Sequence, residues 1–172
     1  MTTRLTTRLL LGAIAGVAGT VAMTAAMNRL HPRLPRSDRY PLPPREITER
    51  LVGTESEDDI KDAATAAHHG YGAVTGALLA AAQPAMTARF GSGAGVAVWA
   101  ASYFGWIPAM GVLSPAHRHP PARNALMIAA HLVWGAVTAA SYRELVTARR
   151  TVFRDGPVAD APDQLPSTGD DQ

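Results

Sequence analysis

The stretch AAHHGYGAVTGA at residues 66–77 reappears, without a gap, as AAHLVWGAVTAA at residues 129–140. Alanine matches carry little information in an alanine-rich chain, but a histidine, an aromatic residue, a glycine, a valine and a threonine also align. Both copies lie inside long segments that carry no Asp, Glu, Lys or Arg. The repeat therefore predicts two similar helical hairpins within a lipid bilayer.

Four of the aligned residues in each copy follow the spacing i, i+3, i+4, i+7, which places them on one stripe of an α-helix. In the first copy the stripe holds His68, Tyr71, Gly72 and Thr75, and in the second His131, Trp134, Gly135 and Thr138. A stripe that repeats in this way predicts that both helices present the same face to a shared interior.

Charge is concentrated between four apolar segments of a 172-residue chain, and each segment is close to the roughly 20 residues that a helix needs to cross a bilayer. The predicted fold is an all-α, integral membrane four-helix bundle built from two similar hairpins, a parallel internal repeat. The expected membrane domain is 1–154, with spans at about 9–28, 63–83, 93–113 and 124–142, a polar loop at 29–62, and a disordered acidic tail at 155–172.

The N-terminus also has the features of a secretory signal, with two arginines before an apolar run and small residues near position 26. An internal match argues against cleavage, because AGVA at 15–18 recurs at 94–97. The first span then pairs with the third. The distance from Gly95 to Met110 in the third span is four residues longer than the distance from Gly16 to Met27 in the first. The third span is therefore predicted to be about one helical turn longer.

Local signals predict several helix ends. Pro44 and Gly53 suit the start and the end of a short helix in the polar loop, and Ser56 suits the N-cap of the second span. The glycines at 91–93 predict a tight turn before the third span, and Pro108 predicts a kink within it.

Small residues spaced four apart predict close helix packing, because lipid provides no hydrophobic drive between helices. The expected packing positions are Gly12, Gly16, Gly72, Gly76, Gly91, Gly95 and Gly135. Packing within one chain is the favoured interpretation, and a homodimer through one of these small-residue faces is the alternative.

Histidines inside predicted spans are candidates for function, since ionisable groups are costly in lipid unless they are paired or face a polar cavity. The candidate proton, metal or packing site comprises His68, His69, Tyr71, Thr75, His131, Trp134 and Thr138. Simple packing by neutral imidazoles, a proton- or metal-responsive site and a bound lipid or small ligand all remain open. His117 and His119 are expected to form an exposed pair in the loop before the fourth span.

Composition excludes several other classes of function. There is no cysteine, so disulfides, thiolate metal sites and a cysteine nucleophile are ruled out, and a net charge of +2 without a basic stripe argues against nucleic-acid binding. Motifs typical of soluble enzymes, such as a Walker loop, GxSxG or HExxH, are not found. We therefore expect a non-enzymatic protein with no cofactor, whose partner is the lipid bilayer.

The pattern resembles the YagU-like family of small bacterial inner-membrane proteins. The residues that carry the resemblance, over about 9–142, are a glycine-rich first span, a proline-containing loop and the AHHxxYG motif of Ala67, His68, His69, Tyr71 and Gly72, followed by Gly76. The resemblance implies a multi-pass protein of the inner (plasma) membrane with no assigned molecular role.

Basic residues divide almost evenly between the two sides of the predicted membrane. Seven lie on the side of the termini and the second loop, and nine lie in the first and third loops. The cluster from Arg143 to Arg154 directly follows the last span, which favours termini in the cytoplasm. The sequence-based hypothesis is a structural or stress-related membrane protein, with a small transporter, channel or pH or metal sensor that uses the paired histidines as the alternative.

Overall fold

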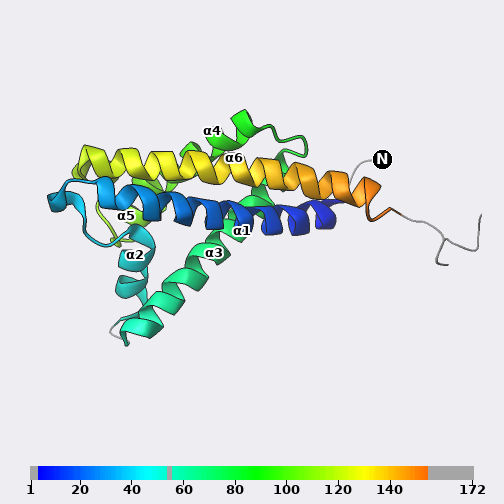
Figure 1. Ribbon diagram of the computed structural model, residues 1–172. Helices are drawn as coiled ribbons and strands as arrows, with labels where there is room; N and C mark the ends of the chain where they lie inside the picture. The colour runs from blue at the N-terminus through cyan, green and yellow to red at the C-terminus, as the bar shows by residue number, and fades with distance from the viewer. Residues whose placement is uncertain (1–3, 54–55, 155–172) are drawn as a thin grey trace, which may run out of the picture.

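The computed structural model describes residues 4–53 and 56–154, and the predicted tail at 155–172 lies outside these ranges. All regular structure in the described ranges is helical, which confirms the all-α class (Figure 1). In chain order the elements are α1 (Leu5–Leu30), η1 (His31–Arg33), η2 (Arg36–Asp38), α2 (Pro43–Val52), α3 (Glu57–Ala82), α4 (Ala88–Ala101), η3 (Ser102–Trp106), α5 (Ile107–Ala109), η4 (Ala116–Arg118) and α6 (Pro121–Thr151).

The two longest apolar helices, α1 and α6, lie side by side and run in opposite directions (Figure 1). Helix α3 packs obliquely against α1, and α4 packs against α6. The short helix α2 packs beside the N-terminal part of α3, and its Ile47 also packs against the apolar core that α1 and α6 share. The order of packing is therefore α3, α1, α6, α4, with α2 attached to the first of these.

Two helical segments, Leu5–Arg33 and Pro121–Thr151, are long and apolar enough to cross a membrane by length and composition. Helix α3 covers the predicted second span but begins with the acidic residues 57–59, and α4 has only 14 residues. The coarse expectation of apolar spanning helices thus holds for the first and last predicted spans.

The ends of α2 and α3 follow from their capping residues. Pro43 and Pro44 occupy the first turn of α2, and Gly53 follows its last turn with a φ of 89°, a conformation that favours glycine. The Ser56 hydroxyl accepts a hydrogen bond from the Asp59 backbone N–H at 3.2 Å, as the N-cap prediction required. Both local predictions are confirmed.

The third apolar segment differs from its prediction at the start. The glycines at 91–93 do not form a turn, because α4 begins earlier, where the Thr87 hydroxyl accepts a hydrogen bond from the Phe90 N–H at 3.2 Å. The connection from α3 therefore lies at 83–87. Gly91 lies inside the helix, where a side chain would collide with the backbone of α6. Its role is therefore close packing and not a turn of the backbone.

The predicted kink exists but is displaced from Pro108. Regular α-helix ends at Ala101, and the π-helical segment η3 contains Gly105 with non-helical angles (φ −108°, ψ −109°). Pro108 has no N–H, and its ring would clash with the carbonyl four residues earlier, so a straight helix cannot continue through it. The extra length of this segment, which predicted an additional helical turn, is taken up by this break.

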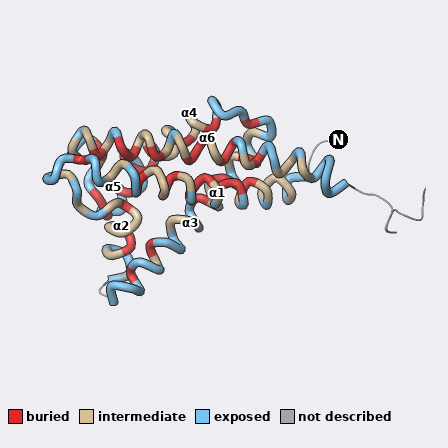
Figure 2. Tube along the Cα trace, in the orientation of Figure 1, coloured by how far each residue is buried: buried red, intermediate tan, exposed pale blue. Residues whose placement is uncertain are grey.

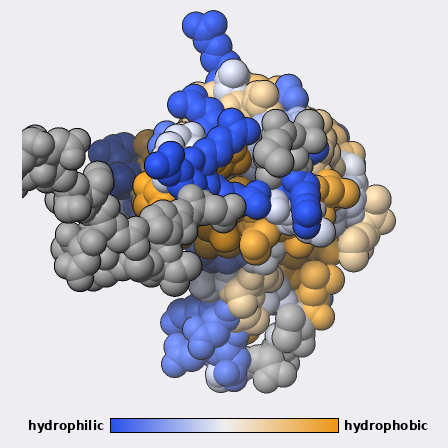
Figure 3. Space-filling view, turned by 90° about the vertical axis from the view of Figure 1, so that its right-hand side faces the viewer, coloured by the Kyte–Doolittle hydropathy of each residue, from blue (hydrophilic) through white to orange (hydrophobic). Residues whose placement is uncertain are grey.

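Buried and exposed positions alternate along α1, as the colours of the tube in Figure 2 show. Most of the buried residues are small, whereas several large apolar residues are exposed. The buried positions are Gly12, Ala15, Gly16, Gly19, Thr20, Met23 and Met27, and the exposed large ones are Leu5, Leu10, Ile14, Val17 and Val21. The end view in Figure 3 shows apolar surface between the charged groups. The inside of α1 thus holds small residues along most of its length and methionine toward its C-terminal end.

Candidate functional site

A partly open cavity of about 270 Å³ lies where α1, α2, α3, η3 and α6 meet. Four of the seven predicted candidate residues line it, namely His68, Tyr71, His131 and Trp134. Other lining residues include Met23, Pro43, Ile47, Ser102, Tyr103, Trp106 and Met127. The matching stripes of the two sequence copies therefore reach one shared space, with the polar groups in a mostly apolar lining.

The two cavity histidines differ in their hydrogen bonds. His131 Nδ1 lies 2.8 Å from the Met127 carbonyl oxygen, which only accepts, so Nδ1 carries the proton and Nε2 of the neutral ring is an acceptor. His68 Nε2 is buried and has no hydrogen-bond partner among the described residues. A buried polar atom left unpaired costs free energy, so this nitrogen marks a position where a ligand atom would be favourable.

Tyr71 connects α3 to the break in the third apolar segment. Its hydroxyl lies 3.0 Å from Ser102 Oγ, which in turn donates to the Val98 carbonyl oxygen at 2.8 Å. Trp106 Nε1 donates to the same Ser102 oxygen at 3.3 Å. The Tyr71 and Trp106 rings, 6.1 Å apart between centroids, form part of the cavity rim.

Three candidate residues lie elsewhere. His69 bonds to the Thr65 carbonyl oxygen at 2.8 Å on an outer face of α3, and the Thr75 hydroxyl donates to the Tyr71 carbonyl at 2.7 Å. Thr138 is buried where α6 meets Gly19 of α1. None of the three lines the cavity: Thr75 and Thr138 lie about one turn beyond the aromatic residue of each stripe, and His69 is not on the stripe.

All seven predicted packing glycines lie at helix contacts. In the α1 and α3 pair, a Cβ at Gly12 would lie 2.6 Å from the Gly76 carbonyl oxygen, and one at Gly16 would overlap the Gly72 carbonyl. In the α4 and α6 pair, a Cβ at Gly95 would overlap the His131 carbonyl. Gly91 and Gly135 lie against each other in that same pair. These faces are filled within one chain, so a homodimer through them would require the pairs to open.

Sequence analysis did not identify Arg123 as a structural residue, yet its side chain is only 1% exposed. Its guanidinium donates to the Tyr40 carbonyl oxygen at 3.0 Å, to the Pro41 carbonyl, and to Glu46 Oε2 at 3.0 Å. The same group lies 3.6 Å from the centroid of the Tyr40 ring. Arg123 therefore fastens the loop before α2, and α2 itself, to the start of α6.

The expectation of an exposed pair at His117 and His119 is wrong for His119. Its Nδ1 lies 2.9 Å from the Tyr40 hydroxyl, and its Nε2 lies 3.0 Å from the Ser114 carbonyl oxygen. Burial raises the pKa of the Tyr40 phenol above its ordinary 10.0, although Arg123 acts in the opposite direction. Only His117 is exposed, and His119 is part of the loop anchor.

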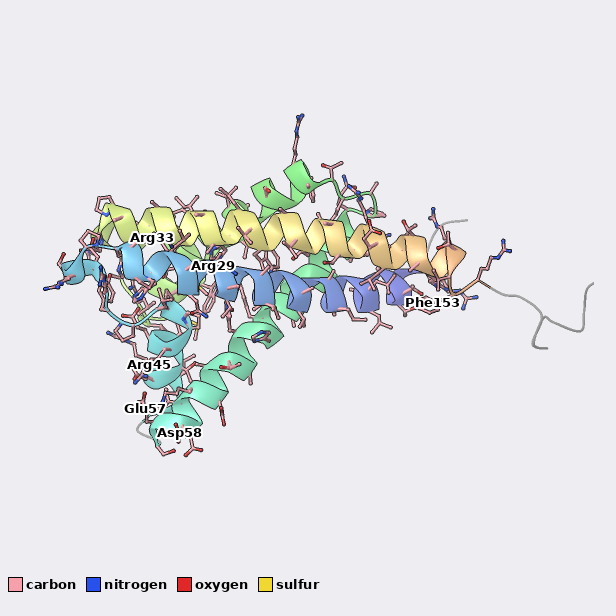
Figure 4. All side chains as sticks on the ribbon, in the orientation of Figure 1. Arg29, Arg33, Arg45, Glu57, Asp58 and Phe153 are labelled. Carbon is pink, nitrogen blue, oxygen red and sulfur yellow. The ribbon has the colours of Figure 1, made fainter. Side chains whose placement is uncertain are left out.

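In the first turn of α2, Arg45 points toward Glu57 at the start of α3 (Figure 4). Arg45 also bonds to Glu49 of its own helix at 2.9 Å. The guanidinium of Arg45 lowers the pKa of the Glu57 carboxyl below its ordinary 4.5. Both ion pairs of α2 therefore start from adjacent residues of its first turn, Arg45 toward α3 and Glu46 toward α6, and the helix lines the cavity from Pro43 to Leu51.

Within residues 4–53 and 56–154, no three or more His, Asp or Glu side chains are grouped closely enough to hold a metal ion. Comparison of the chain with protein families, curated proteins and solved structures finds no match in any of the three. Inference about function therefore depends on the geometry of the fold and the cavity.

Proposed function

We propose that this chain is an integral membrane protein with a structural, non-enzymatic role, in which four helices cross the bilayer as two hairpins. The observation that carries the proposal is the burial pattern of α1, where glycine, alanine, threonine and two methionines face other helices and leucine, isoleucine and valine face outward. Helices in lipid pack through small residues, and their large apolar residues contact acyl chains. In water the same surface would be a large exposed apolar patch.

The glycine contacts support the division into two hairpins, α1 with α3 and α4 with α6. Gly16 and Gly95 align in the sequence repeat, as do Gly72 and Gly135. Gly72 lies against Gly16, whereas Gly135 lies against Gly91, one helical turn before Gly95. The two hairpins would then share one packing scheme with a shift of about one turn between their registers.

The proposal includes location in the inner (plasma) membrane with both termini in the cytoplasm, and membership of the YagU-like family that the sequence resembles. A role in membrane structure or in stress is consistent with that resemblance. The amphipathic helix α2 would lie on the headgroup region, beside the loops at the same end of the bundle as Arg29 and Arg33 (Figure 4).

A charge on the outer face of α1 tests membrane insertion. We expect Val21→Asp to disturb insertion, because an acidic residue near the centre of a spanning helix costs about 2.5 to 3.5 kcal/mol. Val21 is 56% exposed, so in a soluble protein the same change would be nearly neutral. The measurement is the fraction of protein that remains in membranes after an alkaline carbonate wash.

Val152→Asp is the matched control, because Val152 is also exposed and follows the last helix. We expect wild type and this control to stay in the membrane fraction and to need detergent for extraction. Recovery of wild type as a monodisperse, detergent-free protein would overturn the proposal.

A second candidate function is a small transporter, channel or pH or metal sensor. The specific observation in its favour is that His68 and His131 line the same cavity. Replacing both with glutamine retains hydrogen-bonding groups but removes the ionisable imidazoles.

For the structural proposal we expect the double variant His68→Gln/His131→Gln to keep its melting temperature. In liposomes, wild type and double variant should show equal proton flux and equal zinc flux, with His69→Gln as the control for an outer histidine. Wild-type flux that the double variant abolishes would contradict the structural proposal in favour of the second candidate.

A further inference from the structure

The chemistry of the cavity at the junction of α1, α2, α3, η3 and α6 points to a ligand site. We propose that it binds an uncharged, hydroxyl-bearing hydrocarbon taken from the membrane, with the hydroxyl group between the imidazoles of His68 and His131. The inference rests on the proposed membrane location, since lipid is the source of such a molecule. Helix packing alone would require no ligand in this cavity, so the inference adds a ligand class to the site.

The lining selects for an apolar and neutral molecule. None of the seventeen lining residues is Asp, Glu, Lys or Arg, and two of them are histidines. Most of the lined surface is apolar. A ligand carboxylate would lose its hydration without gaining an opposite charge, which is unfavourable. Small-molecule sites typically combine apolar walls with a few convergent polar groups in this way.

The two imidazoles match a group that both donates and accepts a hydrogen bond, and a hydroxyl is a simple group of this kind. Nε2 of neutral His131 accepts a hydrogen bond, because Nδ1 donates to Met127. His68 Nε2 is buried without a partner, and in its Nε2–H form it donates. A hydroxyl donates one hydrogen bond and accepts another, so it is complementary to this acceptor and donor, which line the same cavity.

The size of the cavity limits the hydrocarbon. One water molecule occupies roughly 30 Å³ in the liquid. If each non-hydrogen atom of a ligand takes the same space, a volume of 270 Å³ holds about nine of them. Octanol is of this size, and so is the part of a larger lipid that would enter. The aromatic rim at Tyr71 and Trp106, together with Pro43 and Ile47 of α2, would contact its chain.

Binding is tested with the full chain in lipid nanodiscs and isotope-labelled octanol, measured by equilibrium dialysis against protein-free nanodiscs. We expect saturable binding of about one octanol per chain above the lipid background. Unlabelled octanol should compete, whereas octane and octanoate should compete at least about tenfold more weakly, since octane makes no hydrogen bond and octanoate is charged.

Single variants assign the head-group site. His68→Leu and His131→Leu should each weaken octanol binding about fivefold, the value of one hydrogen bond, and leave octane binding unchanged. His69→Leu is the matched control, because His69 lies next to His68 but faces outward. If a histidine variant does not fold, Ala67→Phe provides a second test, since Ala67 lines the cavity and a ring there should abolish binding of every chain.

Each alternative outcome counts against the inference. Membrane-inserted protein that shows no saturable octanol binding would overturn the ligand site and leave the membrane proposal intact. Octane binding as well as octanol would mean a plain apolar void, and octanoate binding more tightly would mean a charged imidazole site. Protein that does not enter membranes at all would overturn the proposed function itself.

Discussion

The variant Gly16→Leu is expected to destabilise the whole bundle by about 3 kcal/mol or more, because it inserts a side chain where two helix backbones touch. A Cβ at Gly16 would overlap the Gly72 carbonyl oxygen and would lie 3.1 Å from the Gly76 Cα. Both neighbours are backbone atoms, so no change of rotamer relieves the overlap. Helix α1 must move away from α3, and its contact with α6 moves with it.

Helix propensity acts in the opposite direction and provides the control. Leucine in place of glycine within a helix is favourable by about 0.8 kcal/mol when nothing obstructs the side chain. A Cβ at Gly70 of α3 or at Gly93 of α4 would meet no neighbouring atom within 4 Å, so Gly70→Leu and Gly93→Leu should be neutral or stabilising. Thermal unfolding in detergent measures all three, and equal melting of Gly16→Leu and wild type would contradict the packing role.

The predictions that held depend on short-range signals. The start of α2 at its prolines, its end at Gly53 and the N-cap of α3 at Ser56 each involve residues within one helical turn of one another. Such interactions are present in the local sequence, so they can be recognised before the fold is known. The apolar character of α1 and α6 is likewise a local property of composition.

The predictions that failed involve residues whose role depends on a distant partner. A glycine that allows a turn and a glycine that allows close packing look the same in one sequence, and Gly91 belongs to the second kind because α6 lies against it. The break at η3 precedes Pro108, where the Ser102 hydroxyl meets Tyr71 of α3. The repeat did predict which histidines to examine, because helical spacing places them on matching stripes.

The wall that α2 contributes to the cavity was not predictable, since amphipathic spacing does not show where a helix will attach. The same is true of Arg123, which lies after two prolines in a segment that resembles an exposed loop. Charged residues are almost never fully buried unless they are paired, so nothing local marks this arginine as interior. Its partners come from about eighty residues earlier in the chain.

The variant Arg123→Met is expected to release the loop before α2, and α2 itself, at a cost of about 3 to 5 kcal/mol, because it removes one partner of a buried ion pair. Glu46 would lose its cation, and the Tyr40 and Pro41 carbonyls would lose their donors. Arg123→Lys should be intermediate, because an ammonium keeps the charge but lacks the planar fork that reaches several acceptors. Arg118→Met is the matched control, because Arg118 is exposed at the end of η4, shortly before α6 begins.

Hydrogen exchange distinguishes this local release from global unfolding. In Arg123→Met the amides of α2 should exchange much faster, while those of α1 and α3 near Gly16 and Gly72 stay protected, because their contact does not involve Arg123. In Gly16→Leu the protection of α1 and α3 should be lost first. Unchanged exchange of α2 in Arg123→Met would mean that the Arg45 and Glu57 ion pair and the apolar contacts of Ile47 hold α2 without Arg123. The cavity would then keep its wall without the buried arginine.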